Sequence, residues 1–409
     1  MTADKRDLLI LGGGLVGMTL ALAAARQGLS SHVVDRADPA ELTAEGFDGR
    51  ASAISTASWN LFTNIGLADA LEPFGCPIDS IAVTDGMKPG RIDFQPEAHK
   101  GSPGDTLGRM FANRTLRLAL FEAAKDQPLI SWHANAQVTE RTRGEHGASA
   151  TLAHGPKLAA SLMIGAEGRN SPTRQEAGIA VARWDYRHRA IIVGLTHEQA
   201  HANVAWEIFY PSGPFALLPL LDGAEGEHRS ALVWTVAEKD AAGILALSSR
   251  AFVAEVEKRM HGIFGAVAVE GPRSSFPLGF HHTAKITAQR LVLVGDAAHG
   301  LHPIAGQGLN VGLRDVGALV EVLTDGMRLG LDPGDAQLLA RYERWRGLDT
   351  FMVALATDGL TRLFGVPGKL PSAIRRFGMG VVQRTPPLKR WFMDEARGVS
   401  GAVPELLKG

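Results

Sequence analysis

Two glycine-rich segments far apart in the sequence carry the residues best suited to chemistry. In the first, Gly12, Gly14 and Gly17 follow the spacing G-x-G-x-x-G. The first glycine allows a tight turn, the second lets a pyrophosphate approach the backbone, and the third lets a helix pack closely on a strand. Asp35 lies 18 residues beyond Gly17, after a second apolar run. A carboxylate there can accept hydrogen bonds from ribose hydroxyls, so this segment predicts a dinucleotide site.

The second glycine-rich segment lies in the last third of the chain. Gly295 and Asp296 follow the apolar run 291–294, and a loop at 303–308 leads into a long helix. Asp296 is placed to accept a hydrogen bond from a ribityl hydroxyl. The glycines leave room for a flat ring, and the N–H groups at the start of the helix can stabilise the anionic form of a reduced flavin. If both segments bind one dinucleotide, the ligand is held by two distant parts of the chain. Such binding favours FAD over a nicotinamide cofactor, which is held more loosely.

The elements around the first segment form a predicted βαβ unit. Residues 7–11 are an apolar strand, residues 15–27 are helical and stop at Gly28, and residues 31–35 are the second strand. A glycine after the last turn is a common helix end. Residues 8–25 carry no charge, but their four glycines argue against one continuous apolar helix. We therefore interpret the stretch as strand, turn and helix rather than as a signal peptide or membrane span.

Further elements follow from the spacing of apolar residues. Helical spacing predicts helices at residues 50–65, 113–125, 250–263, 308–328 and 336–364. Alternation and turn residues predict strands within 78–94, within 130–165, and at 190–195, 204–210, 215–221, 230–236, 274–278 and 291–294. The strand-like runs in the middle of the chain indicate a mostly antiparallel sheet.

These elements predict an α/β fold with two interleaved domains. A Rossmann-like FAD-binding domain takes residues 1–75, 105–182 and 285–330. A mostly antiparallel substrate-binding sheet domain takes residues 76–104 and 183–284. Residues 331–409 form a C-terminal helical region.

Composition narrows the class of protein. The 409 residues are 45% hydrophobic and 21% charged, with a net charge of −1, which is typical of a globular chain and predicts no nucleic-acid partner. Cys76 is the one cysteine, so no internal disulfide can form, and we expect a reducing, cytoplasmic setting. His299 and His302 lack acidic or cysteine partners at ligand spacing, so we predict no metal site.

Four segments resemble those of the group A flavoprotein monooxygenases, specifically the hydroxylases of ubiquinone biosynthesis, and the likeness covers nearly the whole chain. The most specific is the stretch 295–315, which contains His-Pro-x-Ala-Gly-Gln-Gly-Leu-Asn-x-Gly-x-Arg-Asp. Residues 50–54 are similar to the family's Arg-x-x-Ala-Ile/Leu segment, Asn113-Arg114 to the start of its FAD-contacting helix, and residues 165–174 to its Asp-Gly motif. Glu167 replaces the aspartate of that motif, and Ala112 replaces a glutamate.

The resemblance implies a fold of the glutathione-reductase type, arranged as in p-hydroxybenzoate hydroxylase. It implies that reduced FAD meets O₂ in a dry pocket and forms a C4a-hydroperoxide, which hydroxylates a polyprenylated phenol on the way to ubiquinone. NAD(P)H or another external donor supplies the electrons. The residues expected beside the flavin ring are Pro303, Gly306, Gln307 and Gly308. The implied FAD-binding residues are Gly12, Gly14, Val16, Gly17, Asp35, Arg36, Arg50, Arg114, Val138, Asp296, Gly308, Leu309 and Asn310.

Two further features leave alternatives open. Trp206, Phe215 and Leu217 alternate on the middle strands and either line a pocket for the aromatic ring and prenyl chain or pack in the sheet core. Residues 359–393 contain basic and apolar side chains but no acid, which suggests a solvated surface, or a contact with an anionic membrane or a biosynthetic complex. The sequence does not indicate an oligomeric state.

Two other functions compete with the hydroxylation of a polyprenylated phenol. One is NAD(P)H-dependent hydroxylation of a small soluble aromatic. The other is a non-catalytic protein that binds FAD or prenyl lipid on the same fold. The intact Gly306-Gln307-Gly308 loop favours an enzyme, because a carrier has no need to keep room for a flavin ring there.

Overall fold

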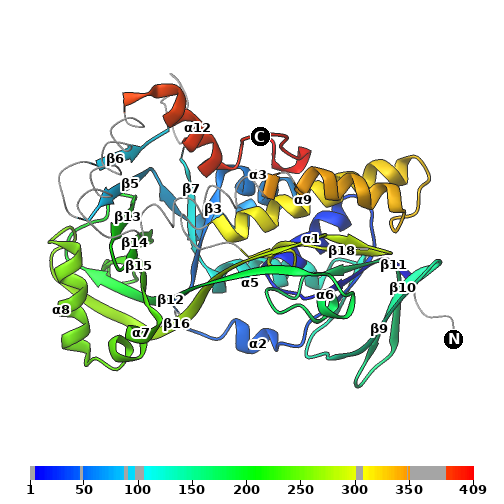
Figure 1. Ribbon diagram of the computed structural model, residues 1–409, viewed down its shortest axis with the longest axis horizontal. Coiled ribbons are helices and arrows are strands. Elements are labelled where there is room, and N and C mark those ends of the chain that lie inside the picture. The colour runs from blue at the N-terminus through cyan, green and yellow to red at the C-terminus, as the bar shows by residue number, and fades with distance from the viewer. Residues whose placement is uncertain are drawn as a thin grey trace.

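The computed structural model describes residues 5–46, 49–86, 91–96, 106–300, 307–347, 349–350 and 384–409. Within these residues the chain forms two large sheets at opposite ends of the molecule, with a small three-stranded sheet between them (Figure 1). The first large sheet is mostly parallel and the second is mostly antiparallel. This arrangement confirms the predicted α/β fold.

The first sheet is built around β1 (Lys5–Leu11), which pairs in parallel with a strand on each side. Residues 8–11 are fully buried because helices and strands cover both faces of the sheet, which explains their continuous apolar run. The other strands of this sheet are β2 (Ser31–Val34), β8 (Ile130–His133), β9 (Val138–Gly144), β10 (Gly147–Leu152), β11 (Lys157–Gly165), β17 (Thr287–Ala288) and β18 (Leu291–Leu293).

Three long helices pack on this sheet. Helix α1 (Leu15–Arg26) is buried along most of its length and contacts α9 (Gln307–Arg328). Helix α5 (Asn113–Lys125) is amphipathic and buries Leu116, Leu120 and Phe121. Strand β1 followed by α1 confirms that the uncharged N-terminal stretch is strand, turn and helix. Among the described residues, no helix is long and apolar enough to cross a membrane.

The second sheet has two faces with different roles. Its outer face packs on α7 (Glu238–Leu245) and α8 (Ser249–Met260), and side chains such as Trp234 and Phe252 fill the space between them. Its inner face is turned toward the first sheet. The strands are β5 (Ser80–Asp85), β6 (Arg91–Phe94), β12 (Val181–His197), β13 (Val204–Tyr210), β14 (Gly213–Leu220), β15 (His228–Ala237), β16 (Val267–Thr283) and β19 (His299–Gly300).

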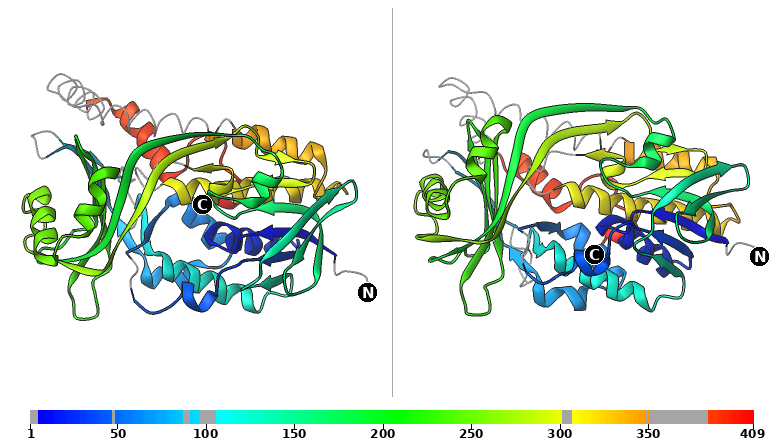
Figure 2. Two further views of the ribbon diagram at one scale, coloured as in Figure 1. Left: turned by 60° about the horizontal axis from the view of Figure 1, so that its bottom comes forward. Right: turned by 90° about the horizontal axis from the view of Figure 1, so that it is seen from below.

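Two strands of the second sheet are unusually long. Strands β12 and β16 have 17 residues each and pair with each other in antiparallel fashion along almost their whole length. They form a ribbon that leaves the second sheet and runs beside the first one (Figure 2). The pairing shifts register twice, between Asp185 and His188 and between Ile192 and Gly194. Such bulges bend a strand and increase its twist.

The small sheet corrects one prediction. Residues 50–65 are not one helix, because residues 51–55 form β3 (Ala51–Ser55) and the helix α3 (Thr56–Asn64) begins only after Ser55, whose hydroxyl caps it at Ser58 N. Pairing of β3 with β7 (Gly108–Ala112) outweighs the helical spacing of the apolar residues, and β4 (Cys76–Ile78) completes the sheet. The short elements nearby are α2 (Pro39–Leu42), α4 (Ala68–Leu71) and η1 (Glu72–Phe74).

The C-terminal residues return to the first sheet and its helices. Residues 336–347 and 349–350 are helical, as predicted, and the rest of the predicted helix to residue 364 lies outside the described residues. After α12 (Pro386–Arg397) the chain ends in η4 (Glu405–Leu407), where Leu407 is buried against α3 and α9. The remaining short elements are α6 (Pro172–Glu176) and η2 (Gly295–Ala297).

Candidate active site

A cavity of about 670 Å³ separates the inner face of the second sheet from the loops of the first. Its wall consists of residues that follow the carboxyl ends of three parallel strands: 14–16 after β1, 166–169 after β11 and 294–296 after β18. Strand β3 and the first residues of α5 and α9 complete this wall. Its floor is formed by β12 to β16. We call it the central cavity. Open α/β sheets bind ligands at this edge.

The first glycine-rich segment has the geometry that its spacing predicts. Gly12 has φ +106°, and a Cβ at Gly17 would overlap the carbonyl oxygen of Gly12, so the turn and α1 can approach only without side chains there. A Cβ at Gly14 would meet nothing within 4 Å, because Gly14 faces the central cavity together with Val16. The N-terminus of α1 thus presents its backbone to the cavity and can hold an anionic group.

A second cavity, of about 520 Å³, lies beside the same glycine turn. We call it the lateral cavity, and Gly12, Asp35, Arg36 and Val138 line it. The Asp35 carboxylate accepts a hydrogen bond from Gly13 N at 2.6 Å and another from Ala37 N at 2.8 Å. Asp35 therefore fixes the glycine turn, and its oxygens keep further acceptor capacity toward the cavity.

Glu167, which replaces the aspartate of the family motif, sits between the two cavities and lines the lateral one. One carboxylate oxygen accepts from the Ser171 hydroxyl at 2.6 Å and from Thr173 N at 3.1 Å, and so holds the start of α6. The other pairs with Arg141 at 3.0 Å. The longer side chain therefore still reaches the backbone of the motif while gaining a partner on β9.

Asp296 projects into the central cavity from η2. Burial raises the pKa of its carboxyl group, although the positive charges of Arg169 and His299 oppose this. Behind it, His281 makes a 2.8 Å hydrogen bond with the Asp296 carbonyl oxygen. Burial, with repulsion from Arg169 and Arg174, lowers the pKa of His281 to about 4, so this imidazole is neutral at physiological pH.

The start of α9 contributes Gly308 and Leu309 to the wall of the central cavity. The Asn310 side chain connects this helix to the small sheet. It accepts from Ser55 N and donates to the Ala53 carbonyl oxygen, both at 2.9 Å, and so ties α9 to β3. Pro303 and Gly306 lie outside the described residues, and Gln307 is the first residue of α9.

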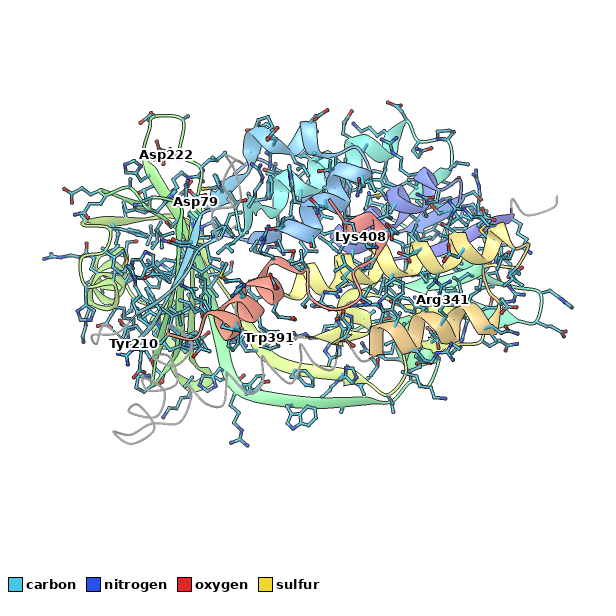
Figure 3. All side chains as sticks on the ribbon, turned by 90° about the horizontal axis from the view of Figure 1, so that it is seen from above. Asp79, Tyr210, Asp222, Arg341, Trp391 and Lys408 are labelled. Atoms are coloured by element: carbon cyan, nitrogen blue, oxygen red, sulfur yellow. The ribbon has the colours of Figure 1, made fainter. Side chains whose placement is uncertain are left out.

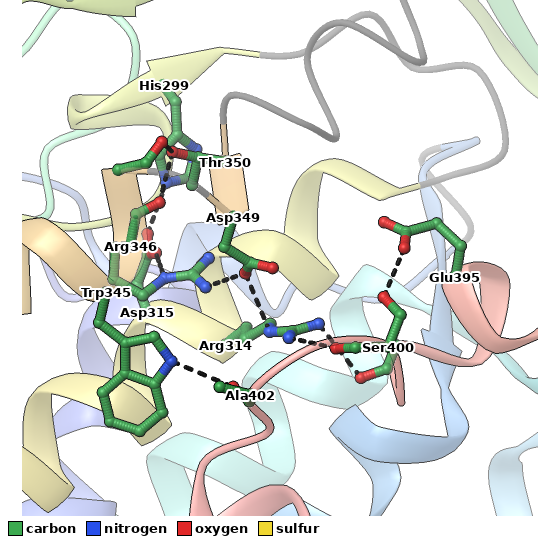
Figure 4. A network of polar contacts seen from close by, with 12 residues as sticks. His299, Arg314, Asp315, Trp345, Arg346, Asp349, Thr350, Glu395, Ser400 and Ala402 are labelled. Atoms are coloured by element: carbon green, nitrogen blue, oxygen red, sulfur yellow. Dashed lines mark hydrogen bonds and ion pairs between the residues drawn. The ribbon is translucent and has the colours of Figure 1, made fainter. Parts of the chain in front are cut away.

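A buried polar network holds the second glycine-rich segment from behind (Figure 4). Asp315 on α9 accepts from Gly295 N at 2.9 Å, from His299 Nε2 at 2.6 Å and from Arg346 Nε at 2.7 Å. Burial alone would raise the pKa of Asp315, but His299 and Arg346 outweigh it and hold the pKa below its usual value. Arg346 also pairs with Asp349, which is 3.0 Å from Arg314 Nε. Sequence reasoning assigned no role to Asp315 or Arg346.

Two arginines expected near FAD are not among the residues lining either cavity. Arg114 Nε donates to the carbonyl oxygens of Thr43 and Ala44 at 2.9 and 2.8 Å, so it fixes the loop after α2. Arg50 precedes β3, and its carbonyl oxygen accepts from Asn113 N at 3.0 Å. Asn113 itself lines the central cavity.

The residues that form the floor of the central cavity are not the ones expected to contact the substrate. Phe215 and Leu217 are fully buried on the outer face of the second sheet, and Trp206 packs on the same side. Because strand residues alternate between faces, the neighbours of these residues line the cavity instead. They are Glu207, Pro214, Ala216 and Leu218. The alternation in residues 204–218 was visible in the sequence, but it did not reveal which face would meet the cofactor-binding loops.

Within the described residues no cluster of three or more His, Cys, Asp or Glu side chains has the geometry of a metal site. His299 is engaged with Asp315, and His302 lies outside those residues.

Comparison with known proteins identifies the class. The FAD binding domain family matches residues 5–348. The ubiquinone hydroxylase UbiL of Rhodospirillum rubrum is 43% identical over 405 residues, covering 99% of this chain and 92% of that protein. The 3-demethoxyubiquinol 3-hydroxylase of Escherichia coli is 32% identical, covering 98% of this chain and all of that protein. The p-nitrophenol 4-monooxygenase PnpA of Pseudomonas putida has a similar fold, with a TM-score of 0.78, 17% identity and coverage of 97% and 98%.

The site and these matches define an FAD-dependent aromatic-ring monooxygenase. FAD fits the observed cradle, because the glycines that face the cavities leave the backbone open while Gly12 and Gly17 permit the close turn. Within this class, the chain belongs to the hydroxylases of ubiquinone biosynthesis.

Proposed function

We propose that this enzyme hydroxylates the aromatic ring of a polyprenylated phenol on the route to ubiquinone, using O₂ and an external reductant. The observation that carries the proposal is the central cavity, which joins the glycine-rich loops to a largely apolar floor. An apolar cavity suits a ring that carries a hydrocarbon chain, because burial of both is favourable. Relatives named for reactions on ubiquinone intermediates support the same substrate class.

The two cavities divide the proposed FAD site between them. Asp35, Arg36 and Val138 would hold the adenosine end in the lateral cavity, and the N-terminus of α1, where Gly14 leaves the backbone accessible, would hold the pyrophosphate. Asp296, Gly308 and Leu309 would hold the flavin end in the central cavity. The bound flavin, once reduced, supplies the activation of O₂ for transfer of one oxygen atom to an electron-rich ring.

The protein's own part is to bind, orient and exclude water. Residues of the floor such as Ile192, Ala216 and Val233 present apolar surface to the substrate. Neutral His281 and the Asp315 network hold η2 in place beneath Asp296 without a proton transfer of their own. Asp296 is positioned to accept from a cofactor hydroxyl.

Turnover with labelled oxygen tests the proposal. Purified protein should be yellow, and with reductant, ¹⁸O₂ and a phenol carrying a short prenyl chain it should form a product heavier by one labelled oxygen atom. NADPH is tried as donor in stopped-flow flavin reduction, with a soluble ferredoxin–reductase couple as the second donor. Equal or faster turnover of a small phenol without a prenyl chain would favour the soluble-aromatic alternative. A colourless protein that still binds prenyl lipid would favour a carrier.

We also propose that α12 makes a peripheral contact with an anionic membrane, through which a lipid-tailed substrate can enter. Most of the basic stretch 359–393 lies outside the described residues. Within the described part, α12 carries Lys389 and Trp391, and Trp391, labelled on this helix in Figure 3, has a side chain that is 46% exposed. The double variant K389E/W391S should sediment less with phosphatidylglycerol vesicles than the wild type. The matched control R328E/L329S changes one basic and one exposed apolar residue at the far end of α9. Equal sedimentation of all three proteins would contradict the contact.

A further inference from the structure

One charged side chain lies on the otherwise apolar floor of the central cavity. Glu207 is in the middle of β13, in a row of paired residues that crosses the sheet: Val83, Glu207, Ala216, Val233 and Ile192. The last four of these side chains line the cavity. The neighbouring row on the same face contains Pro214, Thr235, Ala190 and Phe276. Glu207 is thus surrounded by apolar groups and one hydroxyl.

The carboxylate of Glu207 has no hydrogen bond or ion pair among the residues that the structure describes. Carboxylates in such apolar surroundings are ordinarily paired or hydrogen-bonded, because desolvation of an unpaired charge is unfavourable. The charged groups that share the cavity, Arg169 and Asp296, come from the opposite wall. On the adjoining strand β5 the acidic group on the same face is Asp85, paired in register with Phe209. Burial raises the pKa of Glu207 to about 7.

An unpartnered acceptor that is half-buried among apolar side chains and faces a ligand cavity points to a partner on the ligand. A phenolic substrate brings one hydroxyl donor into this space, and its ring has to lie between the floor and the loops that hold the flavin. Among the described residues of the floor, Glu207 and Thr235 are the polar side chains that can meet that hydroxyl.

We propose that the Glu207 carboxylate accepts a hydrogen bond from the ring hydroxyl of the substrate and thereby sets which edge of the ring faces the cofactor. This inference rests on the proposed function. The hydrogen bond shifts electron density from the O–H bond toward the ring without removing the proton, so the ring becomes more reactive toward an electrophilic oxygen. The same contact discriminates against a ring whose hydroxyl is methylated, because the carboxylate then remains buried without a donor.

The test compares a prenylated phenol with its methyl ether in the full-length holoenzyme. The wild type should prefer the phenol in kcat/KM by about 10- to 100-fold, the range expected for one hydrogen bond to a charged group. E207L should reduce this preference to within about threefold, and E207Q, whose amide keeps an acceptor oxygen, should lie between. T235V removes the neighbouring hydroxyl and should keep the wild-type preference. A wild-type preference in E207L would overturn the proposal.

Ligand binding separates failure of this inference from failure of the proposed function. The dissociation constants of the phenol and the ether, followed through the flavin absorbance, report the contact even if the wild type hydroxylates neither. In the wild type the preference should decrease as the pH falls below about 7 and the carboxyl group gains a proton, whereas in E207Q it should not change in that range. A pH response that persists in E207Q would assign it to another group, such as Asp296, and contradict the role of Glu207.

Discussion

Replacing Asp315 by asparagine should destabilise the enzyme strongly and weaken FAD binding. Asp315 is fully buried, and its carboxylate accepts from Gly295 N, His299 and Arg346 (Figure 4). An asparagine can accept on one side only, and it leaves the fully buried guanidinium of Arg346 with Asp349 as its remaining anionic partner, in place of two. Removing one partner of a buried ion pair costs about 3–5 kcal/mol.

The expected loss is therefore about 4 kcal/mol in the free energy of unfolding, which corresponds to a Tm lower by roughly 5 °C for a chain of 409 residues. Tryptophan fluorescence during heating measures it, and the flavin retained after gel filtration measures the effect on Gly295. Because the pKa of Asp315 is lowered in the folded state, its stabilising contribution is present above the ordinary carboxyl pKa and is lost as the pH falls through the folded value. The difference between D315N and wild type should thus diminish on acidification.

The same helix offers a matched control. Asp325 on α9 pairs with Arg341 at 2.9 Å, but both side chains are about two-fifths exposed, and exposed pairs contribute about 0–1 kcal/mol. D325N should therefore unfold close to the wild type and retain its flavin. If D315N is within about 1 kcal/mol of D325N, then the buried network does not stabilise the site in the way argued from its geometry.

Three further changes follow from local geometry. G17A should abolish FAD binding, because the added methyl group overlaps the Gly12 carbonyl oxygen. In the control G144A on β9 the added methyl group meets nothing within 4 Å, so this variant should bind FAD normally. Flavin absorbance after dialysis distinguishes the two variants. E207Q should stabilise the protein at pH 8 by about 3 kcal/mol, because the pKa of Glu207, raised from 4.5 to about 7, means that its charged form destabilises the folded state. This gain should vanish in thermal melts near pH 4.5, where the carboxyl group is protonated in the folded protein. E167D should lose the Arg141 contact and lower the free energy of unfolding by about 1 kcal/mol; an unchanged urea midpoint would contradict this.

Locally determined features were predictable from the sequence. The glycine spacing at Gly12 to Gly17 and the amphipathic pattern of α5, whose observed bounds equal the predicted ones, depend on neighbours within a few turns. The start of β3 was not predictable in this way, because residues 51–55 are strand through pairing with β7, some sixty residues away in sequence. Helix α7 was missed for a similar reason, since packing on the second sheet rather than a strong local pattern defines it.

The site residues also divide into those that local sequence determines and those that depend on distant contacts. Asp35, Val16, Asp296, Gly308 and Leu309 line the two cavities, and each belongs to a motif with a known spacing. The face of the second sheet that forms the floor depends on how two domains meet, so Phe215 and Leu217 were indistinguishable from Ala216 and Leu218 as cavity residues. Glu207 stands out in the sequence as one acidic residue inside an apolar strand. The sequence did not show that this residue would face the cavity.

The ribbon of β12 and β16 has a mechanical consequence. Because both strands continue from beside the first sheet into the cavity floor, the floor cannot tilt toward the nucleotide loops without bending two hydrogen-bonded chains at once. The backbone hydrogen bonds between β12 and β16 therefore fix the distance between the floor of the central cavity and the nucleotide loops. The ribbon bends most easily at its two bulges, near Asp185 and Ile192. Related enzymes that act on a larger or smaller ring should accordingly differ in the side chains of the cavity floor. They should not differ in the orientation of the second sheet relative to the first.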